Sequence, residues 1–280
     1  MKKTENYIKA RGLSDITKKT YLTHIKEYLK FLKKPLKKTT EQDALNFLVL
    51  KEKKMGHKMS TNHANTIKAS IRALYYAHSM DSIAGKLKGR RPERKIPNTL
   101  TKDSMKKVIE ASKSFYKEEW KNQRGYFFIT LLYQSGARIG EITTLKRADF
   151  NFENNTVKLG SKRSEYLRKL NPLWVKEFKE WLKLTKRKKY VFGNTDEIPY
   201  AVRTAEWYIE NLCARTLNKA YVPHNFRATC ITHRLESGED LSSVSPNFHQ
   251  SPNTTMIYVG GTARSLKKMN NPFEDLECDK

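Results

Sequence analysis

Apolar residues in the first third of the chain recur three or four positions apart, the spacing of a helix that buries one face. Residues 14–32 and 60–78 each carry such a stripe, and a shorter helix is predicted over residues 81–88. Thr39 followed by Gln42 matches a capping box, so another helix is predicted to begin there. No alternating pattern typical of strands interrupts these stripes. The segment is therefore predicted to be a helical domain.

Beyond the first hundred residues the pattern predicts helices that flank a small sheet. Helices are expected over residues 101–117 and 126–133, the second stopped by Gly136. Short apolar segments separated by turns predict antiparallel strands over residues 150–152, 157–159 and 166–170. Further helices are predicted over residues 174–182, 200–219, 223–237 and 252–258. The expected fold class is mainly α with a small antiparallel β-sheet.

Residues 89–98 separate the two patterns and contain two prolines, one glycine and no periodicity, which indicates a linker. Residues 1–98 hold 24 Lys and Arg against 8 Asp and Glu, a net charge of +16, and residues 99–280 hold 31 against 21, a net +10. A small basic helical domain on a basic linker suggests a clamp that closes around a nucleic-acid duplex. Solvated helix faces are the alternative explanation.

Composition narrows the class of partner. The 280 residues include 55 Lys and Arg against 29 Asp and Glu, a formal net charge of +26, which predicts an anionic polymer as partner. No apolar run approaches the ~18 residues of a membrane span, and no apolar segment follows the N-terminal lysines, so neither a membrane nor a signal peptide is expected. Three cysteines without C-x-x-C spacing favour a reducing, cytoplasmic compartment and argue against a disulfide framework or a zinc site.

Two arginines lie in segments that suit phosphate binding. Arg138 stands in Ser-Gly-Ala-Arg-Ile-Gly-Glu, and Arg227 stands three residues after His224 near a predicted helix start. Guanidinium groups stay charged and bind phosphate oxygens through paired N–H groups, so two of them can neutralise a phosphodiester under attack. Glu141 is expected to hold Arg138 or a neighbouring histidine in place. Each motif alone is also common at ordinary helix surfaces.

Three further residues complete a set for phosphoryl transfer. Lys162 falls in a predicted hairpin turn, from which a lysine can protonate a leaving alkoxide; Arg163 and Lys158 are near alternatives. Tyr258 lies on a short predicted helix before two glycines, which would let its hydroxyl swing into a site and form a phosphotyrosine. His249 is expected to hydrogen-bond the phosphate.

The joint order of these residues resembles that of the tyrosine recombinase (site-specific integrase) family: Arg138, Lys162, His224, Arg227, His249 and Tyr258. The resemblance covers nearly the whole chain. It implies a helical core-binding domain over residues 1–88, a basic linker over 89–98, an α+β catalytic domain over 99–269 and an acidic tail over 270–280. Departures from the family pattern are Asn247-Phe248 before the second histidine, Gly260-Gly261 after the tyrosine, and Ala228 after the second arginine.

The resemblance also implies a reaction. The two arginines would bind the scissile phosphate, Lys162 would be the general acid, and His224 would assist deprotonation of Tyr258. The enzyme would cleave and rejoin double-stranded DNA at a specific recombination site through a 3′-phosphotyrosine, without a metal or other cofactor, as a homo-oligomer that is a tetramer on paired sites. Relatives of type IB topoisomerases share most of this residue set and remain an alternative, as does an integrase-like DNA-binding protein that has lost activity.

The acidic tail has two explanations. Phe273 and Leu276 lie three apart among acidic residues in an otherwise basic chain. A frayed terminus would have this composition. A peptide that docks on the adjacent protomer would have it too, and the resemblance favours that second explanation.

Overall fold

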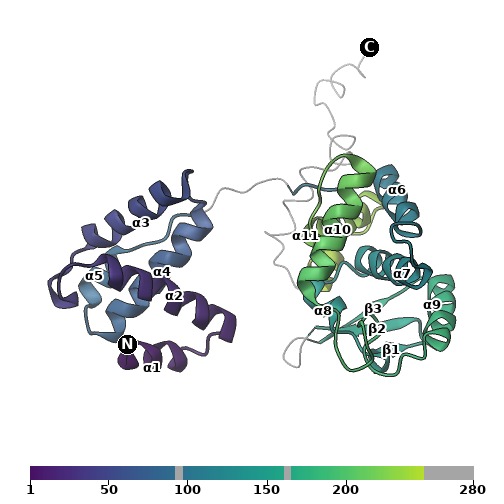
Figure 1. The fold of residues 1–280 in the computed structure, drawn as a ribbon, viewed down its shortest axis with the longest axis horizontal. Coiled ribbons are helices and arrows are strands. Elements are labelled where there is room, and N and C mark those ends of the chain that lie inside the picture. Colours follow the sequence, from purple (N-terminus) through teal and green to yellow (C-terminus); the bar gives the residue numbers. More distant parts are fainter. Residues whose placement is uncertain (92–96, 161–164, 249–280) are drawn as a thin grey trace, which may run out of the picture. The chain divides into compact units, whose positions relative to one another are not determined.

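The computed structural model describes residues 1–91, 97–160 and 165–248. Its contacts divide the chain into two compact units, Met1–Arg94 and Lys95–Lys280. Figure 1 shows that the first unit consists of helices, whereas the second combines helices with one small sheet.

The N-terminal unit is helical, as predicted. It contains α1 (Lys2–Ala10), α2 (Asp15–Phe31), the 3₁₀ turn η1 (Leu36–Lys38), α3 (Glu41–Met55), α4 (Thr61–Ala77) and α5 (Asp81–Lys86). Helix α1 was not predicted, because only Thr4 and Ile8 are buried along it and so few positions make no readable stripe. The side chains of Ser14 and Ser60 cap α2 and α4.

The predicted capping box was one residue out of register. Thr40, not Thr39, precedes α3, and its N–H donates to Asp43 Oδ2 at 2.7 Å. Thr39 is buried instead, and its hydroxyl donates to the carbonyl of Leu36 at 2.6 Å. Two adjacent threonines offer the same cap chemistry, and burial of the first one in the preceding turn decides between them.

The buried stripes of α2 and α4 face each other, and they hold the N-terminal unit together. Ile25 and Tyr28 of α2 are fully buried, as are Ile67 and Ile71 of α4. The hydroxyls of Tyr28 and Tyr75 lie 2.6 Å apart inside this core. This hydrogen bond satisfies both groups where burial would otherwise make them costly.

The C-terminal unit contains a three-stranded antiparallel sheet in the order β1 (Phe150–Asn151), β2 (Thr156–Leu159), β3 (Tyr166–Lys169). The β2–β3 pair nearest residues 161–164 is Leu159 with Tyr166. The helices are α6 (Lys102–Ser112), α7 (Glu119–Ser135), α8 (Ile139–Thr143), α9 (Pro172–Leu184), α10 (Val202–Leu217), α11 (Pro223–Glu236) and α12 (Leu241–Asn247), with the 3₁₀ turn η2 (Arg147–Asp149) before β1.

Helix boundaries differ from the prediction in the first part of this unit. Helix α6 ends at Ser112 rather than near residue 117, and α7 begins at Glu119 rather than Tyr126. The start of α7 is polar and was missed, because Asn122 is buried without being apolar. Its amide binds both the N–H and the carbonyl of Tyr116, which fixes the loop between the helices. Helix α12 was not predicted, and the helix predicted over 252–258 lies outside the described residues.

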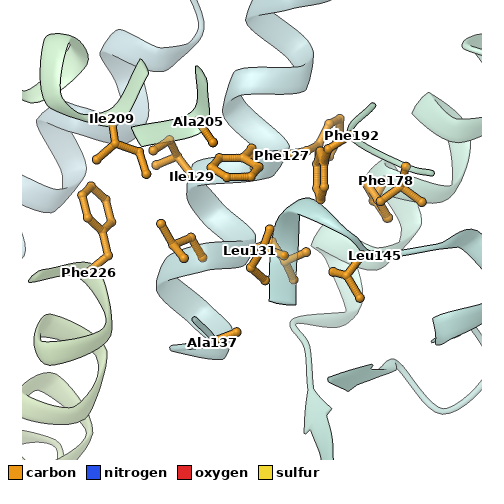
Figure 2. Close-up of a cluster of buried hydrophobic side chains, with 14 of the residues drawn as sticks. Phe127, Ile129, Leu131, Ala137, Leu145, Phe178, Phe192, Ala205, Ile209 and Phe226 are labelled. Carbon is orange, nitrogen blue, oxygen red and sulfur yellow. The ribbon is translucent and has the colours of Figure 1, made fainter. Parts of the chain in front are cut away.

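Helix α7 is the central element of the unit. It is buried on several sides and packs against α6, α8 and α11. Figure 2 shows its side chains Phe127, Ile129 and Leu131 among residues from α9, α10 and α11. In the described part of the chain, no helix is long and apolar enough to cross a membrane.

Candidate active site

The first candidate arginine follows the end of the central helix. Helix α7 stops at Gly136, which adopts a left-handed conformation with φ +57°. Ala137 is then buried in the core, and Arg138 caps the short helix α8. The side chain of Arg138 is 57% exposed. The chain thus reverses at Gly136, and burial of Ala137 anchors the backbone one residue before Arg138. The guanidinium of Arg138 then lies at the surface.

Glu141 holds Arg138 through both the main chain and the side chain. Its Oε2 accepts the N–H of Arg138 at 2.8 Å, and its Oε1 accepts from Arg138 Nη1 at 3.3 Å. The same Oε2 accepts from the hydroxyl of Tyr166 at 2.7 Å. The side chain of Glu141 is only 14% exposed, and the two hydrogen bonds that its Oε2 accepts join α8 to strand β3.

His224 and Arg227 occupy the first turns of α11, which begins with Pro223. His224 is exposed to solvent. Partial desolvation lowers its pKa below the ordinary value of 6.5, and the positive charges of Arg227 and Arg138 lower it further. The lowered pKa favours the neutral form of this imidazole at pH 7.

Arg227 is placed differently from Arg138. It is 3% exposed, and its guanidinium donates from Nη1 to the carbonyl of Gly136 at 2.6 Å and from Nη2 to that of Phe248 at 2.5 Å. Arg227 thereby connects α11 to the turn before Arg138 and to the residue that follows α12. The spacing of His224 and Arg227 places them on one face of α11. The side chain of His224 nevertheless reaches solvent, whereas that of Arg227 is buried.

The remaining three predicted site residues, Lys162, His249 and Tyr258, lie outside the described residues. The structure places the residues that precede two of them: Leu159 ends β2, and Phe248 packs beside Arg227. The described residues contain no group of three His, Cys, Asp or Glu side chains arranged to hold a metal ion.

The structure adds two residues that the sequence reasoning did not connect to the site, Tyr166 and Arg168 on β3. Arg168 is 5% exposed and donates from Nε to the carbonyl of Ser135 at 3.1 Å. Its neighbour Leu167 is 65% exposed. The strand thus turns a leucine outward and an arginine inward, the reverse of the usual arrangement. Alternation in Tyr-Leu-Arg-Lys is readable in sequence, and the available signal was that it places the arginine on the same strand face as the tyrosine.

Three arginines surround the ring of Phe248. The guanidinium carbons of Arg168, Arg227 and Arg234 lie 4.5, 5.2 and 5.7 Å from its centroid. Burial lowers the pKa of Arg168, and the nearby Arg234 and Arg227 oppose its charge further. Arg234 pairs with Glu239 at 3.2 Å. Together with Arg138, these groups give this part of the unit a concentrated positive charge, which attracts an anion.

Comparisons with known families cover both units. The model described as Phage integrase family matches residues 98–264, and the model described as Phage integrase, N-terminal SAM-like domain matches residues 1–81.

Among curated relatives, the chain is 26% identical over 272 residues to tyrosine recombinase XerA of Pyrococcus horikoshii, covering 94% of this chain and 89% of that protein. It is 27% identical over 289 residues to tyrosine recombinase XerD of Oceanobacillus iheyensis, covering 94% and 93%.

Solved structures show the same fold at low sequence identity. The XerH site-specific recombinase bound to a palindromic difH substrate superposes with a TM-score of 0.73 at 19% identity, over 94% of this chain and 81% of that one. A lambda integrase tetramer bound to a Holliday junction gives a TM-score of 0.67 at 16% identity, over 90% and 74%.

Proposed function

Because the chain belongs to the phage integrase family of tyrosine recombinases, we propose that it is a site-specific DNA recombinase whose active site contains Arg138, His224 and Arg227. The observation that supports the assignment of these residues is a contact: Arg227, which shares α11 with His224, donates to the carbonyl of Gly136, two residues before Arg138 at the start of α8. Glu141 accepts hydrogen bonds from both the main-chain N–H and the guanidinium of Arg138.

The proposed reaction is a pair of transesterifications. The hydroxyl of Tyr258 attacks the scissile phosphorus and passes its proton to His224. The bond from phosphorus to the 5′-oxygen breaks, and Lys162 protonates that oxygen. A 5′-hydroxyl from the partner strand then attacks the 3′-phosphotyrosine and releases the tyrosine. The lowered pKa of His224 suits a base that must be neutral to accept a proton.

Arg138 and Arg227 would neutralise the charge of the five-coordinate phosphorus. The guanidinium of Arg138 is already at the surface. The guanidinium of Arg227 is buried and donates to two backbone carbonyls. We therefore expect Arg138 to contact the phosphate first. Contact with Arg227 requires the chain around Phe248 to shift, since that residue covers the guanidinium from one side.

The rest of the proposal concerns the whole chain. Residues 1–88 would bind DNA, residues 89–98 would link them to a catalytic domain over 99–269, and residues 270–280 would form a tail that contacts a neighbouring protomer. Four copies would assemble on paired recombination sites, in the cytoplasm. The net charge of +16 on residues 1–98 supports DNA binding by that part of the chain.

The test uses nicked duplexes with a randomised central region, enriched first for binding and then for covalent attachment. The nick lets the released fragment diffuse away, which traps the phosphotyrosyl adduct for detection on a denaturing gel. Wild-type protein should form the adduct, and Tyr258→Phe should bind the selected DNA without forming it. Tyr133→Phe is the matched control, because it also removes one tyrosine hydroxyl, which bonds to His233, a residue not among the predicted site residues, at 2.8 Å.

Two results would contradict the proposal. A wild-type protein that forms no adduct with any selected duplex is not a recombinase of this kind. An adduct that persists in Tyr258→Phe would assign the nucleophile elsewhere. Supercoiled plasmids that carry either one or two selected sites then distinguish a recombinase from a topoisomerase. A recombinase yields recombinants from paired sites, whereas a topoisomerase relaxes either plasmid.

A further inference from the structure

The carboxylate of Glu141 is shared between two elements of the C-terminal unit. On one side it accepts the N–H and the Nη1 group of Arg138, and on the other it accepts the hydroxyl of Tyr166. The bonds from Arg138 N–H and Tyr166 end on the same atom, Oε2, at 2.8 and 2.7 Å. The orientation of this carboxylate therefore depends on strand β3 as well as on α8.

Tyr166 is itself held in place. Its ring is half-buried, and the guanidinium carbon of Arg168 lies 4.7 Å from the ring centroid. Burial and the bond to Glu141 raise the pKa of the Tyr166 hydroxyl to about 12, so it remains a proton donor at neutral pH. The backbone of Tyr166 pairs with Leu159, the last pair between β2 and β3 before residues 161–164.

We propose that Tyr166 is a positioning residue of the active site: it fixes Glu141, and through Glu141 it sets the position of Arg138 relative to the hairpin of β2 and β3. The inference rests on the proposed function. A carboxylate repels a nearby phosphodiester. It can also attract the guanidinium of Arg138 and so draw that group away from the phosphodiester. The hydroxyl of Tyr166 keeps the carboxylate on the protein side and leaves Arg138 directed outward.

The decisive variant is Tyr166→Phe, which keeps the ring and removes only the hydroxyl. Single-turnover formation of the covalent adduct is measured on the selected nicked duplex, with protein in excess and saturating. A bond to a charged group is lost, so the rate should fall about tenfold, whereas the affinity for DNA should stay unchanged. Tyr133→Phe loses a hydrogen bond of similar length in the same unit, and it should cleave at the wild-type rate.

Two further readouts separate positioning from a general loss of structure. In a Glu141→Ala background the carboxylate is gone, so adding Tyr166→Phe should cost no further rate. On a duplex with a neutral methylphosphonate at the scissile position, Arg138 has less charge to neutralise, so the defect of Tyr166→Phe should shrink. Thermal unfolding followed by circular dichroism checks that each variant is folded.

The inference is wrong if Tyr166→Phe cleaves at the wild-type rate, if its defect is the same on phosphodiester and methylphosphonate, or if its effect persists in full without Glu141. Each of these results requires that wild-type protein form the adduct, so they leave the proposed function standing. Absence of the wild-type adduct would instead contradict the proposed function.

Discussion

Replacement of Gly136 by alanine should destabilise the C-terminal unit for two separable reasons. Gly136 has φ +57°, in the left-handed region that costs an L-residue with a side chain about 1–2 kcal/mol. An added Cβ would also lie 2.3 Å from Cε1 of Phe248 and 3.0 Å from Sγ of Cys230. Both neighbours are buried, so the contact cannot be relieved by moving a flexible chain end into solvent.

The magnitude follows from these two contributions. Overpacking of a dense core costs about 1–3 kcal/mol, and the lower entropy of unfolded alanine offsets about 0.4–1 kcal/mol. The free energy of unfolding should therefore fall by about 1–4.5 kcal/mol. Gly140→Ala is the matched control, because Gly140 lies in α8 with nothing within 4 Å of its added Cβ. Alanine has a higher helix propensity than glycine, so Gly140→Ala should stabilise the unit by about 0.5–1 kcal/mol.

Urea unfolding followed by tryptophan fluorescence measures the effect, because Trp120, Trp174, Trp181 and Trp207 all belong to the C-terminal unit. A double-mutant cycle with Phe248→Ala then isolates the steric part. Removing the ring relieves the contact but not the backbone strain, so the double variant should be more stable than additivity predicts by about 1–3 kcal/mol. Additive costs, or a Gly136→Ala protein as stable as Gly140→Ala, would refute the reasoning.

Three further predictions concern the general acid, pH and salt. Lys162→Ala should regain cleavage on a duplex with sulfur in place of the bridging 5′-oxygen, because a thiolate leaves without a proton; equal defects on both duplexes would assign the acid elsewhere. Burial lowers the pKa values of His24 and His78 below 6.5, so the unfolded chain binds more protons and stability should fall as the pH drops below about 6.5. Urea midpoints by circular dichroism should therefore be lower at about pH 5.5 than at about pH 7.5, and the difference should shrink in His24→Gln. Equal midpoints in the wild type would contradict the lowered pKa values of these histidines. Affinity for the selected DNA should decrease steeply with salt, and a fragment of residues 96–280 should show a shallower slope; an unchanged slope would mean that the charge on residues 1–98 faces solvent.

The sequence by itself determined most of the elements and their order. Helices α2 and α4 follow from stripes whose members are neighbours on one helix face, and the caps Ser14 and Ser60 act within three residues of themselves. Such signals are local, so a linear pattern contains them. The same holds for the stop at Gly136. Local signals failed where a polar residue was buried, as at Asn122, or where two equal caps were adjacent, as at Thr39 and Thr40.

The site needed the tertiary structure. Spacing placed Glu141 beside Arg138, but only the packing of β3 against α8 brings in Tyr166, 25 residues away. Arg227 reaches the carbonyl of Gly136 across 91 residues of sequence, a contact that no local pattern encodes. Residue type and order indicate which chemistry is available. Which arginine is exposed and which is buried is decided by backbone carbonyls from distant segments, because a buried guanidinium must find acceptors wherever the fold supplies them.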